Sequence, residues 1–307
     1  MTTLTIEKIT PNIGAVVTGV DFSQPLVETQ QHEIEQALLT HQVLFFRKQA
    51  ITPKQQADFA RQFGSLHIHP IFPQADNQPE IVLLDNHKTD LRDNAIWHTD
   101  VTFSETPPLG SILAAKQVPS FGGDTLWSSS YAAYDNLSPA FRAFLAGLTA
   151  THNIIQSFPQ ERFGNTPEGF AQWQQAQIDN PPVVHPVIRT HPVTGKKLIF
   201  VNEGFTTKIN ELSDSESKSV LNFLFQHISK PEFTVRWHWQ NDDIAFWDNR
   251  ATQHYATHDY GDTVHRVMHR ATINGDKPFI IQSNGCSINR FNKLAIKDKT
   301  INDNEVN

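Results

Sequence analysis

Short apolar runs bounded by turn-forming residues dominate the chain, and this pattern is typical of β-strands. The segment 234–240 ("TVRWHWQ") alternates apolar and polar residues, as a strand with one buried face does. The other runs, such as "QVLFFRK" and "SILAAKQV", are more continuously apolar. We therefore predict strands at 42–48, 80–85, 111–118, 125–129, 234–240, 243–248 and 265–273.

Helices are fewer, and capping residues mark where they begin. Thr52 with Gln55 has the pattern of a capping box, and a proline follows Thr52 at the first helical position. Ser138 and Ser213 begin two more helices, and another is expected over 33–39. Many short strands with a few helices predict a mainly β fold with outer helices, built on a double-stranded β-helix (jelly-roll) core.

The chain shows no internal repeat and no Gly/Ser-rich linker, so we predict a single domain over 1–283. Within it, the segment 159–182 is long, polar and weakly patterned, which indicates a lid or an insertion. The tail 284–307 is rich in Asn, Asp and Lys and poor in large apolar residues. Such a composition cannot bury enough apolar surface to fold, so we expect the tail to be disordered.

Composition argues against several kinds of partner and compartment. The 307 residues carry a formal net charge of −7 without a block of Lys or Arg, so nucleic acid and anionic membranes are poor partners. The first residues lack the pattern of a signal peptide, and no apolar stretch is long enough to span a bilayer. The single cysteine, Cys286, excludes an internal disulfide and fits a reducing compartment. We expect a cytoplasmic protein.

Candidate metal ligands lie in "IWHTDVTF", where His98 and Asp100 are two residues apart. If this run is a strand, both side chains point to one face. The pair alone fits a hydrogen-bonded polar pair equally well. His254, which follows the aromatic-rich strand at 243–248, is the best third ligand. Two histidines and one carboxylate on one face of a metal leave room for other ligands, as in non-haem Fe(II) oxygenases.

Two arginines support a site that binds anions. Arg266 and Arg270 would share one face of the strand predicted at 265–273, roughly 13 Å apart at about 3.3 Å per residue. Buried arginines are costly unless each meets an anion, and the planar guanidinium grips carboxylate or sulfonate well. The separation is too large for one carboxylate, so two anionic ligands are indicated. The alternative is that one or both arginines face solvent.

Two other classes of function remain open at this point. Three ligands and a water would also serve a zinc hydrolase, although no general base such as an HExxH glutamate lies near the ligands. A catalytically silent binding protein on the same fold is the other alternative.

Long ungapped motifs between Ile13 and Phe279 resemble the taurine/2,4-D dioxygenase family of non-haem Fe(II) enzymes. They include "IGAVVTGVDFSQPL", "WHTDVTFSETPP", "GGDTLW", "HPVIRTHPVTGKK", "WDNRATQHYA" and "MHRATINGDKPF". The resemblance implies a jelly-roll enzyme that uses Fe(II), 2-oxoglutarate and O₂. It implies hydroxylation of taurine or a related alkanesulfonate at the carbon bearing the sulfonate, which releases sulfite and an aldehyde (aminoacetaldehyde from taurine) for sulfur supply. Another sulfonate or a sulfate ester is the alternative substrate.

The resemblance also assigns roles to single residues. It implies iron ligands at His98, Asp100 and His254, and 2-oxoglutarate contacts at Thr125 and Arg266. The substrate residues that it implies are Arg270 and His69 on the sulfonate, with Asn94, Phe158 and Phe205 lining the pocket. Family members also suggest a homo-oligomer, a dimer or a tetramer.

Phe72 departs from the family pattern. It stands where the taurine enzyme of the family has a tyrosine near the substrate amine. Without that phenol, strict selectivity for taurine is not expected, although Phe72 would still line the substrate pocket.

Overall fold

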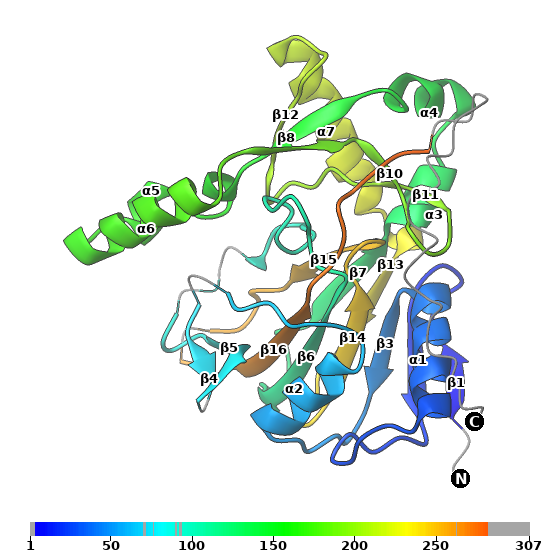
Figure 1. Ribbon diagram of the computed structural model, residues 1–307, viewed down its shortest axis with the longest axis vertical. Helices are drawn as coiled ribbons and strands as arrows, with labels where there is room; N and C mark the ends of the chain where they lie inside the picture. Colours follow the sequence, from blue (N-terminus) through cyan, green and yellow to red (C-terminus); the bar gives the residue numbers. More distant parts are fainter. Residues whose placement is uncertain are drawn as a thin grey trace, which may run out of the picture.

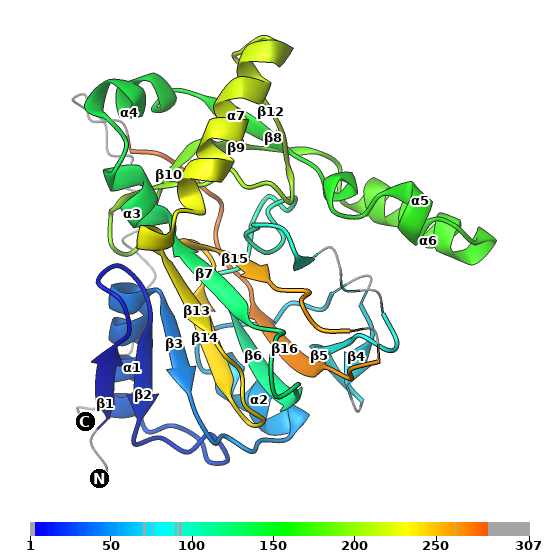
Figure 2. The same cartoon turned by 180° about the vertical axis from the view of Figure 1, so that it is seen from behind.

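The computed structural model describes residues 4–69, 72–75, 77–89, 91, 94–261 and 263–281. The tail 284–307, for which we predicted disorder, lies outside these residues. Figures 1 and 2 show the arrangement of the elements. The strands are β1 (Thr5–Lys8), β2 (Ala15–Thr18), β3 (Val43–Phe46), β4 (Gln74–Ala75), β5 (Gln78–Asp85), β6 (Gly110–Gln117), β7 (Thr125–Ser129), β8 (Thr149–His152), β9 (Val183–Pro186), β10 (Ile188–Thr190), β11 (Lys197–Ile199), β12 (Thr206–Ile209), β13 (Thr234–Trp237), β14 (Ile244–Asp248), β15 (Thr252–Ala256) and β16 (Val267–Ile273).

The α-helices are α1 (Glu28–His41), α2 (Pro53–Arg61), α3 (Ser130–Asp135), α4 (Pro139–Leu145), α5 (Gln160–Phe163), α6 (Pro167–Asp179) and α7 (Asp214–Ile228), with short 3₁₀ turns at Ile154–Gln156 and Pro231–Phe233. Every strand predicted from the apolar runs is present, and so are the helices predicted from their capping residues. Thr52 and Gln55 form the predicted capping box at the start of α2. α1 is longer than the predicted segment 33–39 because its polar first turn carries no apolar signal.

Two sheets pack face to face and position the site. The larger has eight strands in the order β1-β2-β3-β14-β6-β16-β5-β4, and a smaller one has the order β13-β7-β15. Alternate residues of the large sheet, among them Phe45, Trp247 and Met268, pack against Trp127 and Trp237 of the small sheet. A strand points successive side chains to opposite faces, so Arg270 on β16 faces the same interior as Met268.

Helices α1 and α2 cover the other face of the large sheet (Figure 1). Ile34 and Leu38 of α1 and Phe59 of α2 join Phe46 and Phe246 of the sheet in one buried cluster. The prediction of a mainly β chain with helices outside the sheets is thus confirmed for the described part of the chain.

The segment 159–182, predicted as a lid or an insertion, contains helices α5 and α6. Both views show the two helices projecting from the body of the molecule (Figures 1 and 2). Phe170 and Trp173 stack on each other within α6, and Trp173 Nε1 donates to the carbonyl oxygen of Phe158 at 2.7 Å. The projecting segment is therefore tied to residue 158, next to the site described below.

None of the helices in the described ranges combines the length and the apolar character that a membrane span requires.

Candidate metal and substrate site

His98 and His254 are held side by side by their own backbones. His254 lies on β15, and it exchanges two backbone hydrogen bonds with His98, at 3.0 and 2.8 Å. Asp100 lies in a turn after His98, so the premise that 98–100 is a strand is wrong. The side chains of His98 and Asp100 still face one point, and the next residue, Val101, has a φ of +55°.

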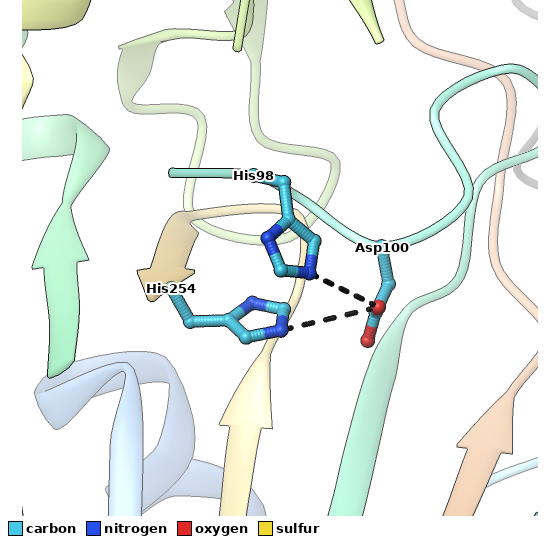
Figure 3. A group of neighbouring side chains, drawn as sticks. All are labelled: His98, Asp100 and His254. Atoms are coloured by element: carbon cyan, nitrogen blue, oxygen red, sulfur yellow. Dashed lines mark ion pairs between the residues drawn. The ribbon is translucent and has the colours of Figure 1, made fainter. Parts of the chain in front are cut away.

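The three ligand atoms converge as a metal requires. His98 Nε2 and His254 Nε2 each lie 3.9 Å from Asp100 Oδ1, and all three side chains are buried (Figure 3). A separation of 3.9 Å is too long for hydrogen bonds, so the alternative of a hydrogen-bonded polar pair does not describe them. Among the described residues, this is the group of histidine and acidic side chains that could hold a metal ion. We call His98, Asp100 and His254 the metal triad.

The protonation states also fit a metal. Burial, the larger cause, lowers the pKa of both histidines, so each imidazole is neutral at physiological pH. His98 Nδ1 lies 2.9 Å from the carbonyl oxygen of Ile96 and donates to it, which leaves the Nε2 lone pair facing Asp100. Neutral imidazole nitrogens and one carboxylate are the donor set that divalent iron accepts. The residues present therefore fit Fe(II).

Asp100 is fixed from several sides. Arg270 Nη1 donates to its Oδ1 at 2.9 Å, and Ser111 Oγ donates to its Oδ2 at 3.1 Å. The side-chain amide of Asn249 accepts from the backbone N–H of Asp100 at 2.9 Å and donates to its carbonyl oxygen at 3.0 Å. A β-branched residue with positive φ costs on the order of 1–3 kcal/mol, so the turn at Val101 needs such support.

Charge keeps Asp100 ionised despite its burial. Burial alone would raise the pKa of the carboxyl group. Arg270 and the two histidines of the triad oppose this effect, and the pKa of Asp100 is held well below its usual range. The carboxylate is therefore available as a ligand at any physiological pH.

One pocket contains all of the predicted substrate residues. Its lining includes two members of the triad, His98 and Asp100, and a largely apolar wall. The lining residues are His69, Phe72, Leu91, Asn94, His98, Asp100, Val101, Phe103, Ser157, Phe158, Phe163, Phe205 and Arg270. The structure thus brings together all the residues predicted for substrate binding, while their roles remain predictions.

His69 and Arg270 give this pocket an anion-binding character. Arg270 is 7% exposed, and its Nε has no hydrogen-bond partner among the described residues. Burial and the nearby Arg270 lower the pKa of His69 to about 3, so its ring is neutral. His69 Nδ1 accepts the backbone N–H of Phe72 at 3.2 Å, which places the ring proton on Nε2 as a donor.

Arg266 is a second buried cation, at a different place. It is 5% exposed, and its Nε and Nη2 have no hydrogen-bond partner within the described chain. Its stem lies against Gly123, which has a φ of +68° and where a Cβ atom would lie only 3.3 Å from Cδ of Arg266. Thr125, two residues later, accepts the indole N–H of Trp239 at 3.0 Å and keeps its hydroxyl proton. Neither Arg266 nor Thr125 lines the pocket that contains Arg270.

The alternative that the arginines face solvent is wrong, since both are buried. The prediction that both arginines lie on one strand is also wrong. Arg266 precedes β16, and the pairing of β16 with β6 shifts register between Val267 and Met268. A buried guanidinium with unpartnered N–H groups fits a carboxylate ligand such as that of 2-oxoglutarate.

Several residues of the site were missed by the sequence analysis. Asn249 contacts Asp100 from 149 residues away in the chain and Ser111 from 11 residues away, and Phe163 lines the pocket from the polar segment 159–182. Asn249 could have been found, because "WDN" puts two polar residues at the end of a fully buried strand.

Several known proteins that are similar to this chain are named after sulfur compounds. The alkylsulfatase of Acinetobacter baylyi is 38% identical over 275 residues, which cover 89% of this chain and 86% of that protein. The alpha-ketoglutarate-dependent sulfate ester dioxygenase of Pseudomonas putida is 35% identical, with 90% and 91% covered. The crystal structure of a taurine dioxygenase from Burkholderia xenovorans superposes with a TM-score of 0.77 at 35% identity, covering 90% of each chain.

These similarities and the metal triad confirm the predicted cofactors, which are Fe(II), 2-oxoglutarate (α-ketoglutarate) and O₂. The family model described as "Taurine catabolism dioxygenase TauD, TfdA family" matches residues 5–272. The chain belongs to this family of α-ketoglutarate-dependent dioxygenases, as its motifs predicted.

Proposed function

We propose that this protein oxidises an organic sulfonate or sulfate ester that has an apolar tail, at the carbon next to the sulfur group. The observation that carries the proposal is the pocket beside the metal triad. Its wall is aromatic and aliphatic, and Arg270 is the one arginine or lysine among its described lining residues. A single cation within an apolar wall fits a ligand with one anionic group and a hydrocarbon tail.

The described lining offers little to a substrate ammonium group. Asp100 is the one carboxylate among these residues, and it belongs to the metal triad. Phe72 stands where the sequence comparison expected a tyrosine, and its ring lies 4.8 Å from that of His69. Taurine therefore remains a predicted substrate, while longer alkyl sulfates and alkanesulfonates fit the wall better.

The side chains of the chain place and neutralise the reactants. Arg270 and the Nε2 proton of neutral His69 would hold the sulfur oxyanion, and the phenylalanine wall would hold the tail and exclude water. Arg266 and the hydroxyl of Thr125 would hold the far carboxylate of 2-oxoglutarate. Fe(II), held by the metal triad, supplies the activation of O₂ while 2-oxoglutarate is oxidised to succinate and CO₂. The binding groups fix which carbon lies beside the metal.

The hydroxylated product then breaks down without further help. The new hydroxyl group loses its proton, its oxygen forms a carbonyl, and the bond from that carbon to the sulfur group breaks. A sulfonate releases sulfite through C–S cleavage, and a sulfate ester releases sulfate through C–O cleavage. Both leave an aldehyde, and the released sulfite or sulfate fits the predicted use in sulfur supply.

Other predictions remain proposals. We propose that the two facing sheets form a jelly-roll core within a single domain over 1–283. The segment 159–182 is proposed as a lid, because Phe163 lines the pocket and Trp173 bonds to the backbone of Phe158. A cytoplasmic location and a homo-oligomer are proposed from the family alone.

A substrate panel tests the proposal. Purified protein with Fe(II), 2-oxoglutarate and O₂ should form succinate faster with hexyl sulfate or pentanesulfonate than without substrate, with taurine turned over less efficiently. No stimulation by any of the three would refute it. Anaerobic Fe(II) plus 2-oxoglutarate should also give a weak visible charge-transfer band, which neither a zinc hydrolase nor a silent binding protein would show.

A further inference from the structure

We propose that Arg270 couples the metal to the anionic substrate, so that the pocket binds the substrate anion strongly only once a divalent metal is bound. This inference rests on the proposed function, because it takes Arg270 as the residue that holds the anion. It adds a coupling between two binding sites: the metal and the anion each strengthen the binding of the other.

The coupling follows from one shared atom. Asp100 Oδ1 is the oxygen that faces both histidine Nε2 atoms at 3.9 Å, and it is also the oxygen that accepts from Arg270 Nη1 at 2.9 Å. The other carboxylate oxygen, Oδ2, is occupied by Ser111. A metal bound by the triad and the guanidinium of Arg270 therefore draw on the same negative charge.

Among the described residues that line the pocket, Arg270 has one strong partner. Asp100 and Arg270 are the one acidic side chain and the one Lys or Arg side chain of that lining. Before metal binds, the ion pair neutralises Arg270, and an incoming anion must compete with a buried carboxylate only 2.9 Å away. Ion pairs in such surroundings are far stronger than in water.

Metal binding removes this competition. A divalent cation takes over the negative charge at Oδ1, and the guanidinium can turn its donors, including the unpartnered Nε, toward an anion in the pocket. Linkage requires the converse as well: an anion that binds Arg270 must raise metal affinity by the same factor. Asn249 and Ser111 hold Asp100 in place throughout, so the exchange needs only Arg270 to move.

Calorimetric titration with hexyl sulfate tests the coupling without catalysis. Mn(II) serves as the metal, in the absence of 2-oxoglutarate, and 1-hexanol is the matched ligand without charge. We expect hexyl sulfate to bind the Mn(II)-loaded protein at least tenfold more tightly than the metal-free protein, and hexanol to bind both alike. Mn(II) titrations with and without hexyl sulfate should show the same factor.

A double-mutant cycle on metal-free protein separates release of Arg270 from general attraction by the metal. Asp100→Asn keeps the size of the side chain but removes the charge, so it should raise hexyl sulfate affinity at least tenfold. When Arg270 is already replaced by Met, adding Asp100→Asn should not raise the affinity for hexyl sulfate any further. Circular dichroism and thermal melts check that each variant is folded. If a variant is not folded, the comparison of metal-free with Mn(II)-loaded wild type still tests the coupling.

The outcomes distinguish this inference from the function on which it rests. If hexyl sulfate binds the metal-free and metal-loaded wild type equally, the coupling is wrong and the proposed function survives. If Asp100→Asn gives the same gain with and without Arg270, Arg270 is not the coupling residue. If hexyl sulfate, pentanesulfonate and taurine all fail to bind the Mn(II)-loaded protein, the proposed function itself fails.

Discussion

Replacing Arg266 should weaken 2-oxoglutarate binding strongly and leave the sulfur substrate almost unaffected. Arg266→Met keeps a long, unbranched side chain but removes the charge and all donors. The guanidinium is 5% exposed, and its Nε and Nη2 have no partner among the described residues, so both are available to a carboxylate. Loss of a buried, charge-assisted contact costs about 2–5 kcal/mol. At about 1.4 kcal/mol per factor of ten, KM for 2-oxoglutarate should rise roughly 30-fold to 4,000-fold.

Arg266→Met should not destabilise the ligand-free protein. Each unsatisfied buried donor costs on the order of 1–3 kcal/mol, so removing the guanidinium should leave the melting temperature unchanged or raise it. Arg189→Met is a matched control. Arg189 is fully buried and also has two unpartnered donors, Nε and Nη1, but its Nη2 donates to Asp276 at 2.6 Å. Because Arg189→Met loses this ion pair, it should melt at a lower temperature than Arg266→Met and keep its KM for 2-oxoglutarate.

The assay is succinate formation, with 2-oxoglutarate and hexyl sulfate varied in turn. Arg270→Met should show the reverse pattern, with a large rise in KM for hexyl sulfate and a small one for 2-oxoglutarate. The assignment of two anions to two arginines would be refuted by Arg266→Met raising both KM values equally, or by a KM for 2-oxoglutarate within threefold of the wild type.

Alanine at any position of the metal triad should abolish turnover and weaken Mn(II) binding while the fold survives, and Asp100→Glu should also fail because its carboxylate is one methylene too far out. Near-normal turnover in any of these variants would remove that residue from the ligand set. Asn249→Leu should weaken Mn(II) binding about tenfold or more, since it loses both hydrogen bonds that hold the backbone of Asp100. Gln42→Leu removes a buried amide that contacts none of the triad and should leave Mn(II) affinity unchanged. Equal effects of these two variants would show that Asn249 has no special role. Phe72→Tyr should raise kcat/KM for taurine relative to pentanesulfonate. An unchanged ratio would mean that the side chain at position 72 does not contact the ammonium group of the substrate.

The elements of the fold could be predicted because their signals are local. An apolar run between turn residues gives β14, and Thr52 with Gln55 gives the start of α2, without knowledge of distant contacts. The order of strands within the sheets carries no such signal. It depends on pairings such as β14 with β3, which join residues separated by most of the chain.

The site was predicted partly for the wrong physical reason. We expected His98 and Asp100 to share a face of a strand, whereas Asp100 lies in a turn. Asn249 supports that turn from 149 residues away in the chain, and Ser111 holds the carboxylate from 11 residues away. A pattern read along the chain can indicate which residue types coordinate a metal, but it cannot show which amide or hydroxyl holds them.

Product analysis with hexyl sulfate tests the proposed function most directly. Protein loaded with Fe(II) is supplied with hexyl sulfate, 2-oxoglutarate and O₂, and the carbon product, the sulfur product and succinate are measured together. We expect hexanal, sulfate and succinate in equal amounts, and no hexanal when either 2-oxoglutarate or O₂ is left out. Hexanol as the product, or release of sulfate without 2-oxoglutarate, would show a hydrolase and contradict the account.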